Sequence, residues 1–309
     1  MKKVLDNKNN YIICAIVGGL GNQILQYIFA KSLAKKLNCK LILDITFSKL
    51  KIPYKKYNKK NPNKFLLNKF IIKDVIYKFN IFKLNFLYLP YLKYLNFFLL
   101  KNLISFFFKI KINAIYYDNS FEKKEMFKNI CDLNFKKNSY FYGYWQNILN
   151  SKVLDKEVIK EICLKKKIIV NKSYFSKKNI AIHIRGNDYL FTKNQKINIA
   201  DESYYNKCIK FFLKKITKPQ FHIYSDDFNY AKKILKDYRH NKNFIYKNKK
   251  NNEINDFEKI RNYYNYIIPN STFSYSAALI NINKHKCILI PKKWDLFKNI
   301  KLPKNIYKI

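Results

Sequence analysis

Residues 11–45 read YIICAIVGGLGNQILQYIFAKSLAKKLNCKLILDI, and their pattern decides the fold class. The apolar, partly β-branched run at 11–17 predicts a strand, and the GGLGN that follows predicts a tight turn. Apolar side chains then recur at helical spacing through QILQYIFAKSLAKKLN, and KLILDI at 40–45 predicts a second strand. Strand, turn, helix and strand form a βαβ unit, so the N-terminal part should contain a parallel sheet.

The second half of the chain repeats this alternation. Strands are predicted at 179–184, 220–225, 242–246, 266–270 and 286–291, with helices at 203–216, 228–238, 254–264 and 271–281. This order predicts a second, doubly wound α/β unit. The boundary is expected between Trp145 and Lys178, with a helix near 151–166, so we divide the chain into domains 1–150 and 151–309.

The bulk composition excludes a disordered chain. Of 309 residues, 48% are apolar and 17% aromatic, which is ample material for a core. The 62 basic and 20 acidic residues give a net charge of +42, but arginine occurs only at Arg185, Arg239 and Arg261. Nucleic-acid binders rely on arginine for bidentate and stacked contacts. We therefore interpret the charge as compositional bias with a diffuse attraction to anionic surfaces, and expect no nucleic-acid partner.

Cysteine spacing and hydropathy bear on the compartment. The six cysteines include no C-x-x-C pair, which argues against a zinc site and favours reduced thiols. The most apolar region, 76–117, is interrupted by lysines, and its longest uncharged run, 84–92, is too short to span a bilayer. We expect a cytoplasmic protein, with 76–117 as a candidate peripheral contact with acidic lipid.

Two motifs place glycine or polar residues where strands end. GGLGNQ at 18–23 either brings backbone N–H groups to a ligand at a helix N-terminus or forms an ordinary strand–helix turn. HIRGND at 183–188 follows a predicted strand, where ligands of open α/β sheets bind. Arg185 there can hold a diphosphate bidentately, with Asp188 orienting it. The alternative is a structural Arg–Asp pair beside a core histidine, and both interpretations stay open.

Two further motifs follow strands of the same half. SDD at 225–227 suits either a divalent-metal site or a helix N-cap. We favour the N-cap, because a helical pattern begins directly after Asp227. NST at 270–272 precedes an alanine-rich helix, where small hydroxyl residues form either a phosphate cradle or an ordinary cap.

The combination is more specific than any single motif. Three motifs follow successive strands of one half, and the glycine turn follows a strand of the other half. Two doubly wound, Rossmann-like domains that face each other across a cleft, one holding a nucleotide diphosphate, form the GT-B architecture of glycosyltransferases. We therefore predict a GT-B-like α/β fold.

The motif blocks resemble, in the same order along the chain, those of glycosyltransferase family 11, the bacterial α-1,2-fucosyltransferases (galactoside 2-α-L-fucosyltransferases). The blocks are GGLGNQILQYIFAKSLAKKLN, GYWQN at 143–147, AIHIRGNDYL, FHIYSDD and IIPNSTFSYSAALIN, and together they cover nearly the whole chain. The resemblance implies an inverting transfer of L-fucose from GDP-β-L-fucose to a galactoside hydroxyl, in the synthesis of LPS O-antigen or capsule. It implies no metal and no other cofactor.

The resemblance also implies roles for individual residues. The expected catalytic residues are Arg185, which binds the diphosphate and stabilises the departing GDP, Asp188, which orients the motif loop, and Asn22, which lies near fucose and acceptor. His183 is expected to hold the nucleotide. The remaining nucleotide-sugar contacts are expected from Asp226, from Asp256 (ribose or guanine), from Asn270, from Ser271 and Thr272 (phosphate), and from Gly19 and Gly21.

The resemblance also implies roles for the two domains: 1–150 is expected to bind a galactose-containing glycan acceptor, and 151–309 the GDP-sugar. Composition and position add the hypothesis of a peripheral contact between this cytoplasmic protein and the inner face of the inner membrane. The chain departs from the family pattern, since Gly186 stands where the family has a second arginine and Ser274-Tyr275-Ser276 replaces S-W-W. These departures keep a related glycosyltransferase with another sugar donor or linkage open. A basic nucleic-acid- or membrane-binding protein is the alternative from a different class.

Overall fold

The computed structural model divides the chain into two compact units, Met1–Lys165 and Lys166–Ile309. The residues that it describes are 10–46, 64–78, 102, 104–106, 111, 113–118, 135–146, 153–166, 168, 176–186, 199–247, 252–297 and 302–309.

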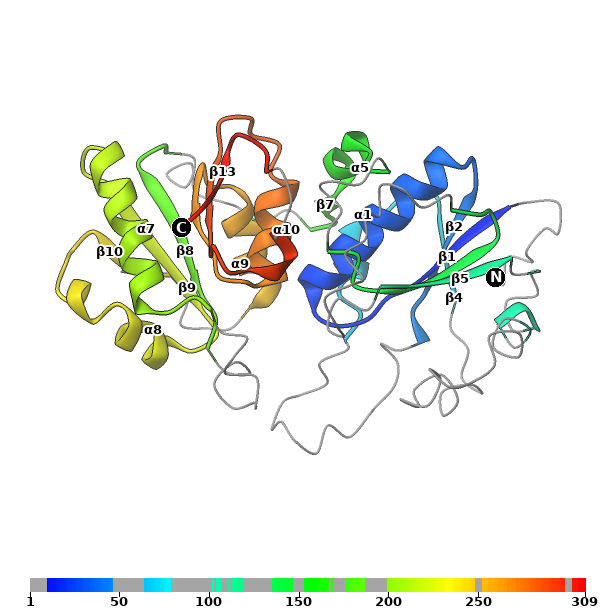
Figure 1. Ribbon diagram of the computed structural model, residues 1–309, viewed down its shortest axis with the longest axis horizontal. Helices are drawn as coiled ribbons and strands as arrows, with labels where there is room; N and C mark the ends of the chain where they lie inside the picture. The colour runs from blue at the N-terminus through cyan, green and yellow to red at the C-terminus, as the bar shows by residue number, and fades with distance from the viewer. Residues whose placement is uncertain are drawn as a thin grey trace. The chain divides into compact units, whose positions relative to one another are not determined.

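The first unit is built on a five-stranded parallel sheet in the order β4-β2-β1-β6-β5. Its strands are β1 (Tyr11–Ala15), β2 (Lys40–Asp44), β4 (Val75–Lys78), β5 (Ala114–Asp118) and β6 (Ser139–Gly143). The helix α1 (Leu20–Lys36) connects β1 to its parallel neighbour β2, so the predicted βαβ unit is confirmed (Figure 1). The shorter elements are η1 (Leu67–Lys69, a 3-10 helix), β3 (Phe70–Ile71), α5 (Lys156–Glu161) and β7 (Cys163–Leu164).

Aromatic side chains fasten α1 to this sheet. Phe29 of α1 stacks on Trp145, with ring centroids 4.3 Å apart and planes 4° apart, and meets Phe141 of β6 edge-on at 5.5 Å. All three side chains are buried. Burying a side chain of this size stabilises a fold by roughly 1.5–3 kcal/mol, so this cluster fixes the helix over the centre of the sheet.

The segment that contains α5 and β7 belongs to the first unit, although the sequence-based division placed residues 151–165 in the C-terminal domain. Asp155, the N-cap of α5, forms an ion pair with Lys35 of α1, with Oδ2 and Nζ 2.6 Å apart. The strand β7 pairs antiparallel with β3. These two contacts tie the segment to the first unit, and the division falls after Lys165.

The second unit has a six-stranded parallel sheet in the order β10-β9-β8-β11-β12-β13. Its strands are β8 (Asn179–Ile184), β9 (Gln220–Ser225), β10 (Phe244–Tyr246), β11 (Asn265–Ile267), β12 (Cys287–Ile290) and β13 (Ile306–Lys308). Its helices are α7 (Glu202–Lys215), α8 (Phe228–Ile234), η8 (Lys236–Tyr238), α9 (Glu253–Arg261), α10 (Thr272–Ile280) and η9 (Asp295–Phe297). Every strand and helix predicted for the second half is confirmed. The edge strand β13 was not predicted, because three residues carry too little pattern.

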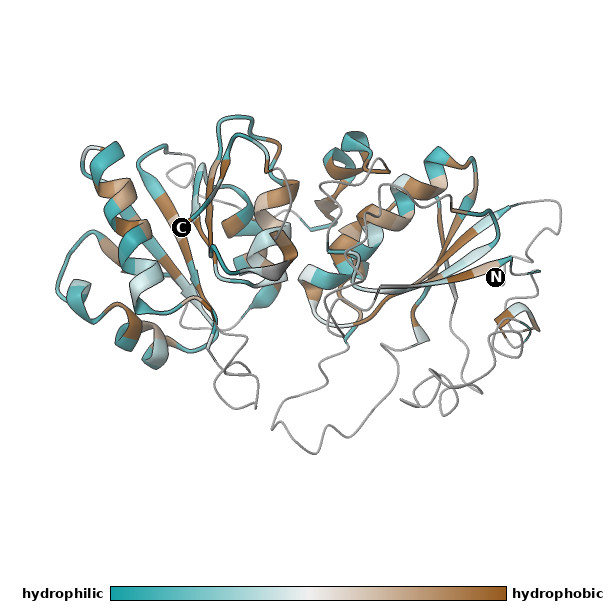
Figure 2. Cartoon of the chain, viewed as in Figure 1, coloured by the Kyte–Doolittle hydropathy of each residue, from teal (hydrophilic) through white to brown (hydrophobic). Residues whose placement is uncertain are grey.

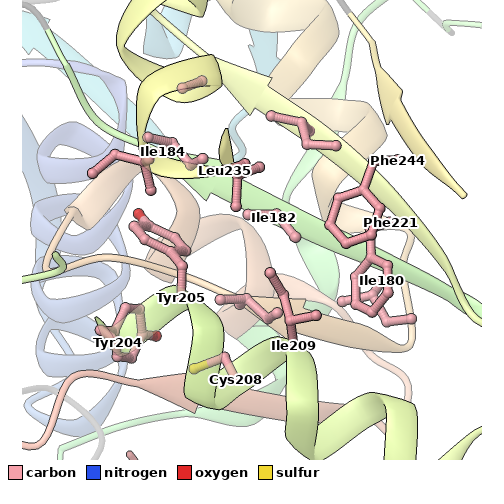
Figure 3. Close-up of a cluster of buried hydrophobic side chains, with 14 of the residues drawn as sticks. Ile180, Ile182, Ile184, Tyr204, Tyr205, Cys208, Ile209, Phe221, Leu235 and Phe244 are labelled. Atoms are coloured by element: carbon pink, nitrogen blue, oxygen red, sulfur yellow. The ribbon is translucent and has the colours of Figure 1, made fainter. Parts of the chain in front are cut away.

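The strands of the second unit present two buried faces. Ile180, Ile182 and Ile184 of β8 face α7 and pack in one cluster with its Tyr205 (Figure 3). Side chains alternate along a strand, so His183 faces the opposite side, where α9 and α10 lie. With helices on both faces, the unit is doubly wound (Figure 1). The predicted α/β fold class is therefore confirmed for each unit.

The hydropathy of the residues agrees with their places in the sheets and helices. Brown, apolar stretches mark the strands of both units, and teal, polar residues lie on the outer side of α7 (Figure 2). No helix in the described part of the chain is both long and apolar enough to cross a membrane.

Candidate functional site

Three of the predicted motifs meet at the carboxyl edge of the sheet in the second unit. The strand β8 lies between β9 and β11, in the register Ile184↔Ser225 and Ile182↔Ile267. The residues that follow these strands therefore lie side by side, and ligands of open α/β sheets bind at this edge. The edge carries Arg185 after β8, Asp226 after β9 and residues 270–272 after β11.

Arg185 forms an ion pair with Asp226. Arginine Nη1 and aspartate Oδ2 are 3.1 Å apart, and the two side chains are 27% and 23% exposed. The other carboxylate oxygen, Oδ1, accepts a 2.7 Å hydrogen bond from the N–H of Gly186. The sequence assigned the orienting carboxylate to Asp188, which lies outside the described residues. The register of β8 and β9 is what identifies Asp226 as the partner of Arg185, because Asp226 follows Ser225 just as Arg185 follows Ile184.

His183 is buried between β8 and α10. Its Nδ1 lies 2.8 Å from Ser274 Oγ, and its ring centroid lies 5.5 Å from that of Phe273. Burial, with the charge of Arg185 as the second cause, lowers the pKa of His183 to about 3, so the ring is neutral at neutral pH. A neutral ring orients neighbours by hydrogen bonding without adding charge. Sequence reasoning missed Ser274, whose three-residue spacing from Ser271 on a helix was the available signal.

The two aspartates of the SDD motif have different structural roles. Asp227 is the N-cap of α8, and its Oδ1 accepts a 3.0 Å hydrogen bond from the N–H of Tyr230. The Ser225 hydroxyl donates to the backbone oxygen of Asp227 at 2.8 Å and closes the turn. The N-cap interpretation is confirmed for Asp227, whereas Asp226 pairs with Arg185. Among the residues that the structure describes, no cluster of three or more His, Cys, Asp or Glu side chains could hold a metal ion.

The NST motif forms the entrance to α10. Ser271 is the N-cap residue and is buried, but its side chain makes no capping hydrogen bond, and Thr272 is the first helical residue. Asn270 and Thr272 are partly exposed. The N–H groups of a first helical turn have no partner within the helix and carry a partial positive charge. This arrangement can bind a phosphate group, with the hydroxyls as additional donors.

Asp256 lies in the first turn of α9. The following residue, Phe257, packs edge-on against Phe273 of α10, with ring centroids 5.4 Å apart. Phe273 is also the residue that contacts the His183 ring. The helix that carries Asp256 therefore lies on the same face of the sheet as His183.

The glycine turn of the first unit joins β1 to α1. Gly18 has a φ of +76°, and a Cβ there would lie 2.8 Å from Asn22 Nδ2. Gly19 is the N-cap of α1, and a Cβ there would meet no atom within 4 Å. Glycine is thus required by conformation and by space at position 18, and by neither at position 19. Gly21 lies in the first turn of α1 and is buried.

Neutral side-chain amides hold this turn in place. Gln26 accepts a 3.1 Å hydrogen bond from Val17 N–H through Oε1 and donates a 2.7 Å bond to the Gly143 carbonyl through Nε2. Asn22 Oδ1 accepts a 3.2 Å bond from Gln146 Nε2. These bonds join the GGLGNQILQ block to the GYWQN block.

A second glutamine supports the turn from the other side. Gln23 donates 2.8 Å hydrogen bonds to the carbonyls of Gly18 and Lys64, and its Oε1 accepts a 2.9 Å bond from Leu66 N–H. Sequence reasoning missed Gln23 and Gln26 as structural residues. The backbone groups that they contact are not identifiable from the sequence, because they are brought near the glutamines only by the fold.

The predicted site residues therefore fall into three groups. In the second unit, the carboxyl edge of the sheet brings together His183, Arg185, Asp226, Asn270, Ser271 and Thr272, with Asp256 on the helix beside α10. Gly19, Gly21 and Asn22 belong to the first unit. Asp188 lies outside the described residues.

Comparison with known protein families gives a match over almost the whole chain. The model of the family described as glycosyl transferase family 11 matches residues 11–309. A comparison with curated protein sequences gave no match.

The solved structures that match the chain include two fucosyltransferases. The NodZ α-1,6-fucosyltransferase soaked with GDP-fucose has a TM-score of 0.44 and 13% identity, over 88% of this chain and 93% of that chain. NodZ from Bradyrhizobium has a TM-score of 0.44 and 12% identity, over 88% and 94%. POFUT1 in complex with GDP-fucose has a TM-score of 0.46 and 12% identity, over 93% and 99%.

Proposed function

The chain belongs to glycosyltransferase family 11, and we propose that it transfers L-fucose from GDP-β-L-fucose to a hydroxyl of a galactose-containing glycan. The proposed linkage is α-1,2, formed with inversion, and the proposed role is the synthesis of a surface glycan such as LPS O-antigen or capsule. The proposed location is the cytoplasm, with peripheral contact at the inner face of the inner membrane.

One observation carries the proposal. A guanidinium, a neutral histidine and the N-terminus of α10 are gathered at the carboxyl edge of one parallel sheet, from the two adjacent strands β8 and β11. A cation beside a helix N-terminus suits a diphosphate better than it suits a neutral ligand. The site chemistry therefore favours a nucleoside diphosphate sugar as the donor.

The mechanism follows from the charges that develop. Displacing GDP from the anomeric carbon builds negative charge on the β-phosphate and oxocarbenium character on the sugar. Arg185 and the N–H groups at the start of α10 stabilise that negative charge, because they are already oriented before the reaction begins. His183, neutral at the working pH, donates or accepts a hydrogen bond at the nucleotide.

The acceptor side of the proposal assigns the first unit to the glycan. Asn22, together with the turn at Gly19 and Gly21, contacts the fucose and the acceptor hydroxyl in this assignment. Its support is the position of the turn at the carboxyl end of β1, where the neighbours β2 and β6 lie on opposite sides of the strand. Open α/β sheets bind ligands at the carboxyl ends of their strands.

The reaction is proposed to need no metal. Assays with saturating EDTA and with added Mg²⁺ or Mn²⁺ test this directly, and we expect equal transfer rates in all three. Loss of transfer in EDTA that a divalent ion restores would contradict the metal-free proposal.

The function is tested by a donor panel. The purified chain is incubated with GDP-fucose, GDP-mannose, UDP-galactose and UDP-glucose, each with lactose as acceptor, and released nucleotide is measured. We expect turnover with GDP-fucose alone, and a product whose NMR spectrum shows fucose on O2 of galactose. Turnover with another donor, or another linkage, would identify the related glycosyltransferase that the departures from the family pattern leave open.

The membrane contact is tested separately. Flotation with vesicles of phosphatidylcholine alone and with added phosphatidylglycerol should show binding only to the anionic vesicles, since the chain carries a net charge of +42. Equal recovery with both vesicle types would remove the peripheral contact from the proposal.

A further inference from the structure

We infer that Asp226 is a positioning residue that sets the orientation of Arg185 for transfer and makes no contact with the nucleotide itself. The inference rests on the proposed function and deepens it, because it distinguishes Arg185, which holds the donor, from Asp226, which orients Arg185.

One carboxylate, that of Asp226, holds two consecutive residues. Oδ2 lies 3.1 Å from the guanidinium of Arg185, and Oδ1 accepts the 2.7 Å hydrogen bond from Gly186 N–H. The side chain of the arginine and the backbone beside it are therefore fixed by the same group. A planar guanidinium that is held in this way presents its remaining edge in one direction.

The backbone turn that carries Asp226 is itself held by hydrogen bonds. Asp227 N–H donates a 3.0 Å hydrogen bond to Ser225 Oγ, and the Ser225 hydroxyl donates to the Asp227 carbonyl at 2.8 Å. Asp227 in turn caps α8. The turn that carries Asp226 is thus closed on both sides, so the backbone from which its side chain extends has a defined position.

Gly186 allows a close approach between the ends of β8 and β9. A Cβ at this position would lie 2.6 Å from the Cβ of Asp227 and 3.5 Å from Oδ1 of Asp226. A separation of 2.6 Å between two carbon atoms is far inside van der Waals contact. Only glycine lets the two strand ends come near enough for the Gly186 N–H to reach the Asp226 carboxylate.

Removing the charge of Asp226 distinguishes a positioning role from a role in nucleotide binding. A carboxylate beside a diphosphate site repels the ligand, so removing its charge should leave GDP affinity unchanged or increase it. The same change removes the carboxylate charge from its ion pair with the arginine. A misplacement of about 1 Å at a reacting group lowers the rate about 100-fold. A positioning role therefore predicts opposite effects on binding and on turnover.

The experiment uses the full chain with the substitution Asp226→Asn, which keeps the shape and an oxygen for the Gly186 N–H but removes the charge. We expect kcat to fall at least tenfold, the Kd of GDP to stay equal or decrease, and the melting temperature to match that of the control. The control is Asp201→Asn, which changes an aspartate N-cap on α7 in the same unit, and should leave all three quantities at the wild-type values.

Three results would overturn the inference. Wild-type kcat in Asp226→Asn means that the carboxylate does not aim the arginine. A tenfold weaker GDP affinity with unchanged kcat means that Asp226 contacts the nucleotide. A lowered melting temperature with equal losses of binding and turnover means a purely structural role. Failure of the wild-type chain to bind GDP or to transfer fucose would instead refute the proposed function.

The substitution Gly186→Ala provides an independent check. It leaves every charge in place but forces the strand ends apart, so we expect reduced kcat with GDP affinity retained. Unchanged kcat in this variant would contradict the close-approach argument.

Discussion

The two units present different chemistry at equivalent places in their sheets. At the carboxyl edge of the second sheet, a guanidinium, a carboxylate and a helix N-terminus lie together, and they are suited to a charged ligand. At the glycine turn of the first sheet, the polar groups that contact one another are neutral amides. The glutamines of this glycine-rich block bind backbone groups of their own unit. The charged groups therefore mark the second sheet as the one whose edge suits a diphosphate.

The largest expected effect is on the charged edge. Arg185→Lys retains the positive charge but loses the planar fork, so transfer should fall about 100-fold or more in kcat, as when a preorganised donor is removed. The rate is measured at saturating GDP-fucose, with the exposed Arg239→Lys as the matched control. Turnover near the wild-type value would remove Arg185 from the mechanism and with it the contrast between the units.

The glutamine that supports the glycine turn should affect stability. Gln26→Ala removes the bonds to Val17 and Gly143 and leaves a buried gap, which should cost about 2–4 kcal/mol of unfolding free energy. Urea unfolding measures this loss. If the variant is as stable as the wild type, the amide network does not hold the turn.

The pH dependence of stability tests the environment of His183 in the second unit. The unfolded chain protonates His183 near its ordinary pKa of 6.5, whereas the folded chain protonates it only near about 3. The unfolded state therefore binds more protons between these values, and stability decreases as the pH falls below 6.5. His183→Gln lacks this titration and should lose about 2 kcal/mol less than the wild type between pH 7 and pH 5. Equal losses in urea unfolding would place the histidine in a more solvated environment.

The smallest expected effect compares two neighbouring glycines. Gly18→Ala puts a Cβ at positive φ, 2.8 Å from Asn22 Nδ2, and should cost about 1–2 kcal/mol. Gly19→Ser meets open space and adds an N-cap hydroxyl, so it should be neutral or stabilising. Thermal unfolding of the pair checks this, and equal effects would mean that the turn relaxes around a side chain at either position.

Much of the fold was readable from local pattern. Alternating apolar runs and amphipathic stretches predicted the βαβ opening and the elements from β8 to β12, because each carries its own periodicity. The partner of Arg185 was not predictable, since it depends on β9 lying beside β8. The bond from Gln26 to Gly143 joins residues 117 positions apart, and no local signal marks it.

The central claim is that the carboxyl edge of the second sheet binds a guanosine diphosphate sugar. The most direct measurement is a thermal shift of the purified wild-type chain with GDP, with ADP and UDP as controls. A ligand at 100 times its Kd stabilises a protein by about 2.7 kcal/mol, so GDP should raise the melting temperature clearly while ADP and UDP leave it unchanged. No shift with millimolar GDP, or the same shift with all three nucleotides, would contradict the account.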